Sequence, residues 1–309
     1  MRKQIIHTIL SGLLCASGFA QTVQIPGEVP LMRLQSTGNS VGWIAALSGD
    51  FEDAWKNVTE PRGIDGQANG GALAGSRLLD IVPKGRDNRH PREVPVWQLP
   101  DSQEFFFVSG MTINADGAPN AYNPDDTGFD ALAIAGAPGH WDGIITDRSG
   151  NALIQQERDP FPGYYISCTS LSDETKHFTD PTGYVNASKI PYVVLPKDVA
   201  ERGGAELGDF AVVMNLRNGK SSFAIYADIG TLGEGSVALA DALGIWSDAR
   251  HGGTSDNILY RSFPGSGNRK PRTVHEIQSE GEKLVYRWGG TKELSSCLGS
   301  YPAVKSREF

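Results

Sequence analysis

The chain has 309 residues, and its 36 acidic residues outnumber the 28 basic ones, which gives a formal net charge of −8. This balance argues against a nucleic-acid-binding protein, which needs a basic face, whereas it suits a cationic ligand or simply favours solubility. Three cysteines are too few for a disulfide scaffold, and after residue 20 no apolar run approaches the roughly 18 residues needed to span a membrane.

The first 20 residues have the pattern of a secretory signal peptide. Arg2 and Lys3 precede an apolar run over Ile5–Cys15, and small residues end the segment at Ala20. Leu14 precedes the cysteine where a lipid anchor needs a small residue, so we expect cleavage after Ala20. The mature chain then has a net charge near −10, with 26 basic and 36 acidic residues. We expect it to be secreted or periplasmic, with no membrane association.

Two cysteines, Cys168 and Cys297, remain after cleavage. An even pair in an oxidising compartment is a candidate disulfide. We therefore expect one bridge in the mature protein.

Residues 21–104 form an N-terminal segment of unknown role. One helix is predicted over Phe51–Val58, and Gly-rich and Pro/Arg-rich stretches typical of loops or a linker follow. A soft boundary near Pro100 leaves residues 105–309 as a separate domain.

From Phe105 onward, short apolar runs are separated by Gly, Pro, Asn and Asp, which predicts a β-barrel or β-sandwich. A capping box at Thr273–Glu276 predicts a helix to about Leu284. Residues 131–135 are predicted as a short helix or strand. The predicted strands read FFFVSGMTI, GIITD, NALIQQ, YYISCTSL, PYVVLP, DFAVVMN, SSFAIYAD and ILYRSFP.

Two carboxylates lie close together in the sequence after one of these strands. Asn218-Gly219 predicts a hairpin with a type I′ turn, so that Asp228 ends the second strand. Ser236 is the predicted N-cap of a following helix that stops at Gly244, which places Glu234 just outside its N-terminus.

A pair of unequal carboxyl groups is what hydrolysis of a glycosidic bond requires. The apolar strand before Asp228 favours its protonated form, and the positive end of the helix near Glu234 favours the ionised form. We therefore assign Asp228 as the acid and Glu234 as the base. The alternative is that Asp228 forms a turn and Glu234 is a solvated surface charge.

Eight blocks between residues 111 and 290 resemble, in order, the glycoside hydrolase family 75 chitosanases and their bacterial relatives. The resemblance implies an endo-chitosanase that hydrolyses β-1,4 bonds of chitosan with inversion, and the family's essential Asp and Glu fall on Asp228 and Glu234. The blocks are ADGAPNAYNP, GFDALAIAGAPGHWDGIITDRSGNALIQ, PGYYISCTSL, YVNASKIPYVVLP, LGDFAVVMN, YADIG, GEGSVALADALGI and YRSFPGSG.

The run from Leu207 to Gly244 is also similar to double-psi β-barrel proteins, in which a strand, a turn, a strand ending in Asp and a short helix follow one another. This resemblance implies a mainly β fold, namely a six-stranded double-psi-type β-barrel with added loops and a few short helices.

Four further residues are candidates for substrate binding. Asp116 and Asp130 are candidates to meet the ammonium groups of glucosamine, although Asp-Gly is equally a turn former. Tyr122 and Trp141 are candidates to stack on sugar faces, although core packing is the commoner role of an aromatic ring.

No spacing of His, Cys or Asp predicts a metal site, and we expect no cofactor. The expected partner of this chain, as a monomer, is a cationic polysaccharide. Two alternatives remain open: a cell-wall lytic enzyme acting on peptidoglycan, and a non-catalytic polysaccharide-binding barrel.

Overall fold

The computed structural model describes residues 76–84 and 92–287. The predicted signal peptide, the predicted helix over Phe51–Val58 and Cys297 lie outside these ranges, so the first two and the expected bridge between Cys168 and Cys297 stay predictions. Among the described residues the strands are β1 (Arg77–Lys84), β2 (Arg92–Gln98), β3 (Phe105–Asn114), β4 (Gly136–Ala137), β5 (His140–Trp141), β6 (Tyr192–Leu195), β7 (Phe210–Asn215), β8 (Ser221–Ile229), β9 (Glu234–Ser236) and β10 (Thr254–Phe263).

Six of these strands close into a barrel in the order β3-β10-β7-β8-β6-β9, and β9 pairs back with β3. The pairs β3–β9 and β6–β8 are parallel, and the other neighbours are antiparallel. If β3 is exchanged with β8, β6 with β9 and β7 with β10, every strand pair and its parallel or antiparallel direction stays the same. The barrel therefore consists of two equivalent halves of three strands each. The fold is thus mainly β and of the double-psi type, as predicted.

Strand β9 closes the barrel although it has only three residues. Glu234 pairs with Thr112 of β3 on one side and with Val194 of β6 on the other. A strand this short leaves no alternating pattern in the sequence, which predicted only that Glu234 lies just outside a helix N-terminus. Its conformation is set by partners far away in the chain.

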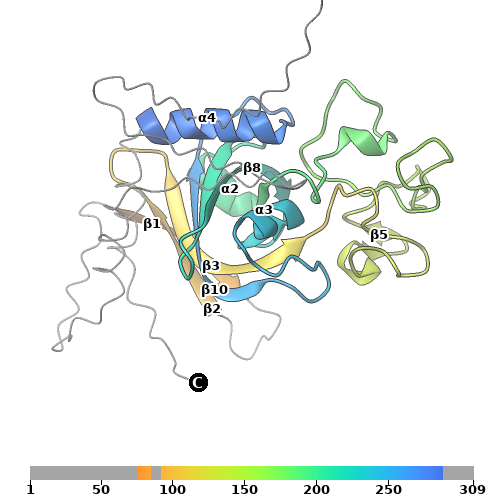
Figure 1. The fold of residues 1–309 in the computed structure, drawn as a ribbon, viewed down its shortest axis with the longest axis horizontal. Coiled ribbons are helices and arrows are strands. Elements are labelled where there is room, and N and C mark those ends of the chain that lie inside the picture. The colour runs from red at the N-terminus through yellow and green to blue at the C-terminus, as the bar shows by residue number, and fades with distance from the viewer. Residues whose placement is uncertain (1–75, 85–91, 288–309) are drawn as a thin grey trace, which may run out of the picture.

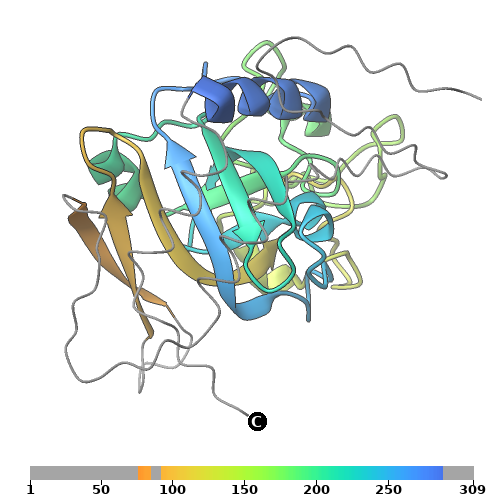
Figure 2. The same cartoon turned by 60° about the vertical axis from the view of Figure 1, so that its left-hand side comes forward.

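Apolar packing on both faces of the sheet holds the barrel together. The first five residues of β7, Phe210–Met214, belong alternately to two apolar clusters, and all six residues of the strand are buried. One cluster includes Ile277 and Val285 of helix α4 (Val274–Arg287), which lies over β7 and β8 in both views (Figures 1 and 2). The other includes Leu239 of helix α3 (Val237–Ala242).

Two of the predicted helix starts are confirmed by their caps. Thr273 and Glu276 exchange capping-box hydrogen bonds at the start of α4, and the Ser236 side chain accepts from the Leu239 N–H at the start of α3. A third α-helix in the described part of the chain, α2 (Lys197–Gly203), ends at Gly204 in the left-handed conformation.

The hairpin between β7 and β8 is confirmed, but its predicted turn type is wrong. A type I′ turn needs positive φ at both central residues, whereas at this turn only Gly219 has one, with φ of 72°. The Gly219 N–H donates to the Asn215 carbonyl, and the Asn215 N–H donates to Lys220. The loop therefore has four residues, and Gly219 alone supplies its left-handed position.

Residues 115–190 form loops on the side of the barrel away from β1 and β2 (Figure 1). Three of the strands predicted here form only isolated bridges, such as Thr146–Ala152 and Ile154–Tyr165. The Gln155 side chain donates to the carbonyls of Pro119 and Tyr165 and so links two of these loops. Leu132–Ile134 forms one turn of 3-10 helix.

The β1–β2 hairpin extends the sheet at the start of β3, where Trp97 pairs with Phe106. The division of the chain near residue 104 stays a prediction. Within residues 76–84 and 92–287, no helix combines the length and the apolar character that a membrane span requires.

Candidate functional site

Asp228 and Glu234 lie at the same level of the sheet, on the two strands that flank β6. Val194 of β6 pairs with Asp228 on one side and with Glu234 on the other. Strands in a sheet are about 4.8 Å apart, so the two Cα atoms are separated by two spacings, about 10 Å. The fold therefore brings both carboxylates to the same end of the barrel.

A bulge in β8 sets the direction of Asp228. Tyr226 and Asp228 pair with the consecutive residues Val193 and Val194, so Ala227 is an extra residue on β8. Bulges interrupt the alternation of a strand and re-aim the side chain beside them. This irregularity falls immediately before the carboxylate.

Asp228 is a buried carboxyl group with several hydrogen-bond donors. Its side chain is 7% exposed, and Oδ1 accepts from the Ser170 N–H (2.8 Å), the Ser170 hydroxyl (2.6 Å) and the Ile229 N–H (3.0 Å). Burial raises the pKa of Asp228 above its ordinary value, and the bonds from Ser170 and Ile229 offset part of that rise. The group therefore favours holding a proton, as a general acid must.

Asp116, two residues beyond β3, lies close enough to Asp228 for the charge of Asp228 to act on it. Asp116 Oδ1 accepts from the Tyr122 hydroxyl at 2.8 Å and Oδ2 from the Asn114 amide at 3.3 Å. Burial raises the pKa of Asp116 well above its ordinary value, and the charge of Asp228 adds to this rise. The site thus contains a third carboxyl group.

Asn114, the last residue of β3, links Asp116 to Glu234. Its amide nitrogen lies 3.3 Å from Asp116 Oδ2 and 3.4 Å from Glu234 Oε2. Its oxygen accepts from the Tyr192 hydroxyl at 2.5 Å and from the Asp116 N–H at 2.9 Å, which turns the NH₂ group towards the two carboxyl groups. The Asn114 amide therefore bridges Asp116 and Glu234.

The other predicted binding residues occupy different positions. Tyr122 is 1% exposed and lies beneath Asp116, and Asp130 is 2% exposed with its Oδ1 accepting from the Ala131 N–H. Neither side chain reaches the surface in this structure. Trp141 is partly buried, packs on the core and is tilted against Tyr165, with ring centroids 5.8 Å apart.

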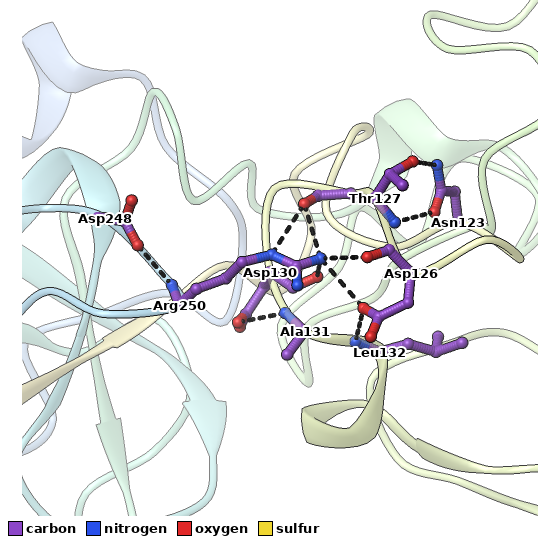
Figure 3. A network of polar contacts seen from close by, with 9 residues as sticks. Asn123, Asp126, Thr127, Asp130, Ala131, Leu132, Asp248 and Arg250 are labelled. Carbon is purple, nitrogen blue, oxygen red and sulfur yellow. Dashed lines mark hydrogen bonds and ion pairs between the residues drawn. The ribbon is translucent and has the colours of Figure 1, made fainter.

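One arginine side chain stabilises the loop that contains Asp130 through several hydrogen bonds. Arg250 donates to the carbonyl oxygens of Asp126, Gly128 and Asp130 and to the carboxylate of Asp126 (Figure 3). Its own N–H donates to Asp248. The loop before β10 thereby holds the loop after Tyr122 in place.

We predict that Arg250→Ala lowers the free energy of unfolding by about 2–3 kcal/mol, because several carbonyl acceptors lose their donor. Urea titration followed by fluorescence measures the loss. Arg148→Ala, at an exposed arginine, is the matched control and should change stability by no more than about 0.5 kcal/mol. Equal effects of the two substitutions would contradict a fastening role for Arg250.

The described residues contain no group of three or more His, Cys, Asp or Glu side chains arranged to hold a metal ion. An open depression of about 810 Å³ lies among the loops of residues 153–182, and its lining includes none of the three carboxyl groups. Asp116, Asp228 and Glu234 are carboxyl groups, which can give or accept a proton.

Three residues of the site were not predicted as such. Asn114 ends a strand, Ser170 lies in a loop, and Tyr192 starts an apolar strand. Each acts through a contact between segments 58 or more residues apart in sequence, except for the local bonds of Asn114 to Asp116. No local pattern signals such contacts.

Comparison with known proteins places this site partly within a known family. Residues 162–285, fewer than half of the chain, match the family model described as fungal chitosanase of glycosyl hydrolase group 75. The matched segment includes Asp228 and Glu234 and begins after Asn114 and Asp116. The resemblance is thereby confirmed for this segment. No curated protein matches the chain.

Proposed function

We propose, from the match of residues 162–285 to a chitosanase family, that the protein is an exported endo-chitosanase that hydrolyses the β-1,4 bonds of chitosan with inversion. The observation that carries the proposal is the pairing of Val194 with Asp228 on one side and with Glu234 on the other, which brings the two carboxylates to the same end of the barrel. Two carboxylates two strands apart leave room for a sugar and for a water molecule.

In the proposed mechanism, Asp228 gives its proton to the oxygen of the glycosidic bond. Glu234 accepts a proton from a water molecule that attacks the anomeric carbon from the opposite side. The carbon–oxygen bond to the leaving sugar breaks as the bond to water forms. Exchange with solvent then restores the proton on the acid and removes it from the base.

The substrate class follows from charge as well as from the family. The site contains three carboxyl groups, and the mature chain carries a net charge near −10. A polymer rich in glucosamine is cationic, so electrostatic attraction favours its binding over that of a neutral or acidic polysaccharide. This attraction is screened by salt, so affinity should fall as ionic strength rises.

A paired assay tests the proposal. Reducing ends are measured on highly deacetylated chitosan, together with viscosity, and turbidity is measured on purified cell walls. We expect new reducing ends and an early fall in viscosity from chitosan, and no clearing of cell walls. An Asp228→Asn, Glu234→Gln double variant, prepared identically, controls for contaminating enzymes.

Two outcomes would replace the proposal with one of its alternatives. Clearing of cell walls without cleavage of chitosan would identify a peptidoglycan-active enzyme. Binding to chitosan with cleavage of neither substrate would identify a non-catalytic barrel.

A further inference from the structure

The loop that contains Ser170 is attached to the barrel at the bulge in β8. Ala227 is the extra residue of that bulge, and its carbonyl accepts from the Leu171 N–H at 2.9 Å. Next to this bond, Ser170 donates its N–H (2.8 Å) and its hydroxyl (2.6 Å) to Asp228 Oδ1. The bulge thus provides the place where a distant segment of the chain reaches the proposed acid.

Further contacts hold the same loop from its other side. The Thr169 hydroxyl donates to the Leu171 carbonyl at 2.7 Å and accepts from the Val185 N–H at 3.0 Å. Leu171 and Val185 are both buried in one apolar cluster of the core. Because both neighbours of Ser170 are fixed in this way, the position of its N–H and hydroxyl is set by tertiary contacts.

The donors around Asp228 Oδ1 determine which of its two oxygens carries a proton. Two of them are the backbone N–H groups of Ser170 and Ile229, and an N–H group does not accept a hydrogen bond. The third is the Ser170 hydroxyl, whose oxygen itself accepts from the Ile229 N–H at 3.2 Å. Since three donors already surround Oδ1, the protonated form of Asp228 carries its hydrogen on Oδ2.

Hydrogen bonds oppose the effect of burial on Asp228. Burial raises the pKa of this carboxyl group, and the largest effect that lowers it is the hydrogen bond from the Ser170 hydroxyl. The titratable groups on which the charge of Asp228 acts are Asp116, Tyr122, Cys168, Tyr192 and Tyr226. None of these named groups is a cation. Donors such as the Ser170 hydroxyl are therefore what favours the ionised form.

We propose that Ser170 is the positioning residue of the proposed acid: it holds Asp228 Oδ1 through two hydrogen bonds, so that Oδ2 carries the proton given to the leaving sugar. The proposal rests on the proposed function. In this step the bond between Oδ2 and its hydrogen breaks as the leaving oxygen gains that hydrogen, and the carboxylate keeps the electron pair. Hydrogen bonds to a charged acceptor are stronger than those to a neutral one, so the two bonds from Ser170 strengthen as the proton leaves.

The test is the pH dependence of kcat and kcat/KM for Ser170→Ala. The substitution removes a donor that favours ionised Asp228, so the alkaline limb of the profile should move to higher pH by about half a unit or more. We expect kcat to fall by about tenfold, because the lost bond is stronger to the charged than to the neutral acid. A raised KM with an unchanged pH profile would overturn the proposal, because Ser170 would then bind substrate.

Two further variants separate the role of the hydroxyl from structural damage. Ser170→Thr keeps the hydroxyl, so its kcat and its alkaline limb should lie nearer to those of the wild type than those of Ser170→Ala. Ser149→Ala, at an exposed serine of another loop, should leave the profile unchanged. A shift of the acidic limb of Ser170→Ala in place of the alkaline limb would contradict the proposal, because Asp228 would then act as the base.

A readout without substrate separates this proposal from the proposed function. Carbon-13 NMR of protein labelled at aspartate carboxyl carbons follows the titration of Asp228, whose signal is assigned by its loss in Asp228→Asn. We expect a midpoint above the ordinary value of an aspartate in the wild type and a higher one in Ser170→Ala. If chitosan is not hydrolysed but this shift is found, the enzyme assignment fails and the link between Ser170 and Asp228 stands. Equal midpoints in the two proteins overturn the link even where hydrolysis is observed.

Discussion

Asp228→Asn and Glu234→Gln should each lower kcat on chitosan by about 10²–10⁴-fold, the usual contribution of a general acid or base. Each substitution keeps the shape of the side chain and removes its proton chemistry. Initial rates of reducing-end formation at saturating chitosan measure the loss. Near-normal turnover in either variant would refute the assignment of acid and base.

The stability of Asp228→Asn distinguishes lost chemistry from lost structure. The pKa of Asp228 is raised in the folded protein, so its protonation stabilises the fold at low pH, and this stability is lost as pH rises through the folded pKa. The amide of the variant stays neutral and still accepts from Ser170 and Ile229. We therefore expect the Tm of the variant to equal or exceed that of the wild type at neutral pH, with a smaller advantage near pH 4. A lower Tm at neutral pH would show that the charge itself supports the fold.

The anomer released first from a chitosan oligomer should be α, because inversion of a β-linkage gives an α-product. Inverting enzymes hold their carboxyl groups roughly 6.5–9.5 Å apart, whereas retaining enzymes hold them about 5–5.5 Å apart. Asp228 and Glu234 flank Val194, and two strand spacings place their Cα atoms about 10 Å apart. A Cα separation of about 10 Å is compatible with the roughly 6.5–9.5 Å between carboxyl groups that an inverting enzyme needs.

Proton NMR during the first minutes of hydrolysis, before mutarotation mixes the anomers, decides this point. Fully mutarotated oligomer in the same buffer is the reference spectrum. Initial release of the β-anomer would mean that a carboxylate attacks the sugar directly, and Glu234 would then be the nucleophile.

The two proposed catalytic residues could be predicted from the sequence because each lies in a recognisable local pattern. Asp228 follows an apolar strand, and Glu234 precedes a helix whose cap, Ser236, is confirmed by its bond to Leu239. The strands β3, β6, β7, β8 and β10 and the helix α4 were predictable for the same reason. Apolar runs bounded by turn residues, and a capping box, act over a few residues.

Local signals failed where a conformation depends on distant partners. The sequence around Glu234 contains no strand pattern, yet residues 234–236 form β9, because Thr112 and Val194 offer backbone partners on both sides. The turn at Gly219 closes in a different register from the predicted type I′ turn, because the Asn215 carbonyl accepts from Gly219.

By itself, the sequence determined a mainly β fold, a strand-end aspartate and a glutamate at a helix start, since hydrophobic periodicity and capping are properties of neighbouring residues. Only the tertiary structure placed Asp116 close to Asp228 and turned the Asn114 amide towards Glu234. These pairs of residues are 112 and 120 positions apart, and their geometry depends on closure of the barrel, which no local preference encodes. The raised pKa values of the site follow from that closure, because burial raises the pKa of both Asp116 and Asp228, and the charge of Asp228 raises that of Asp116 further.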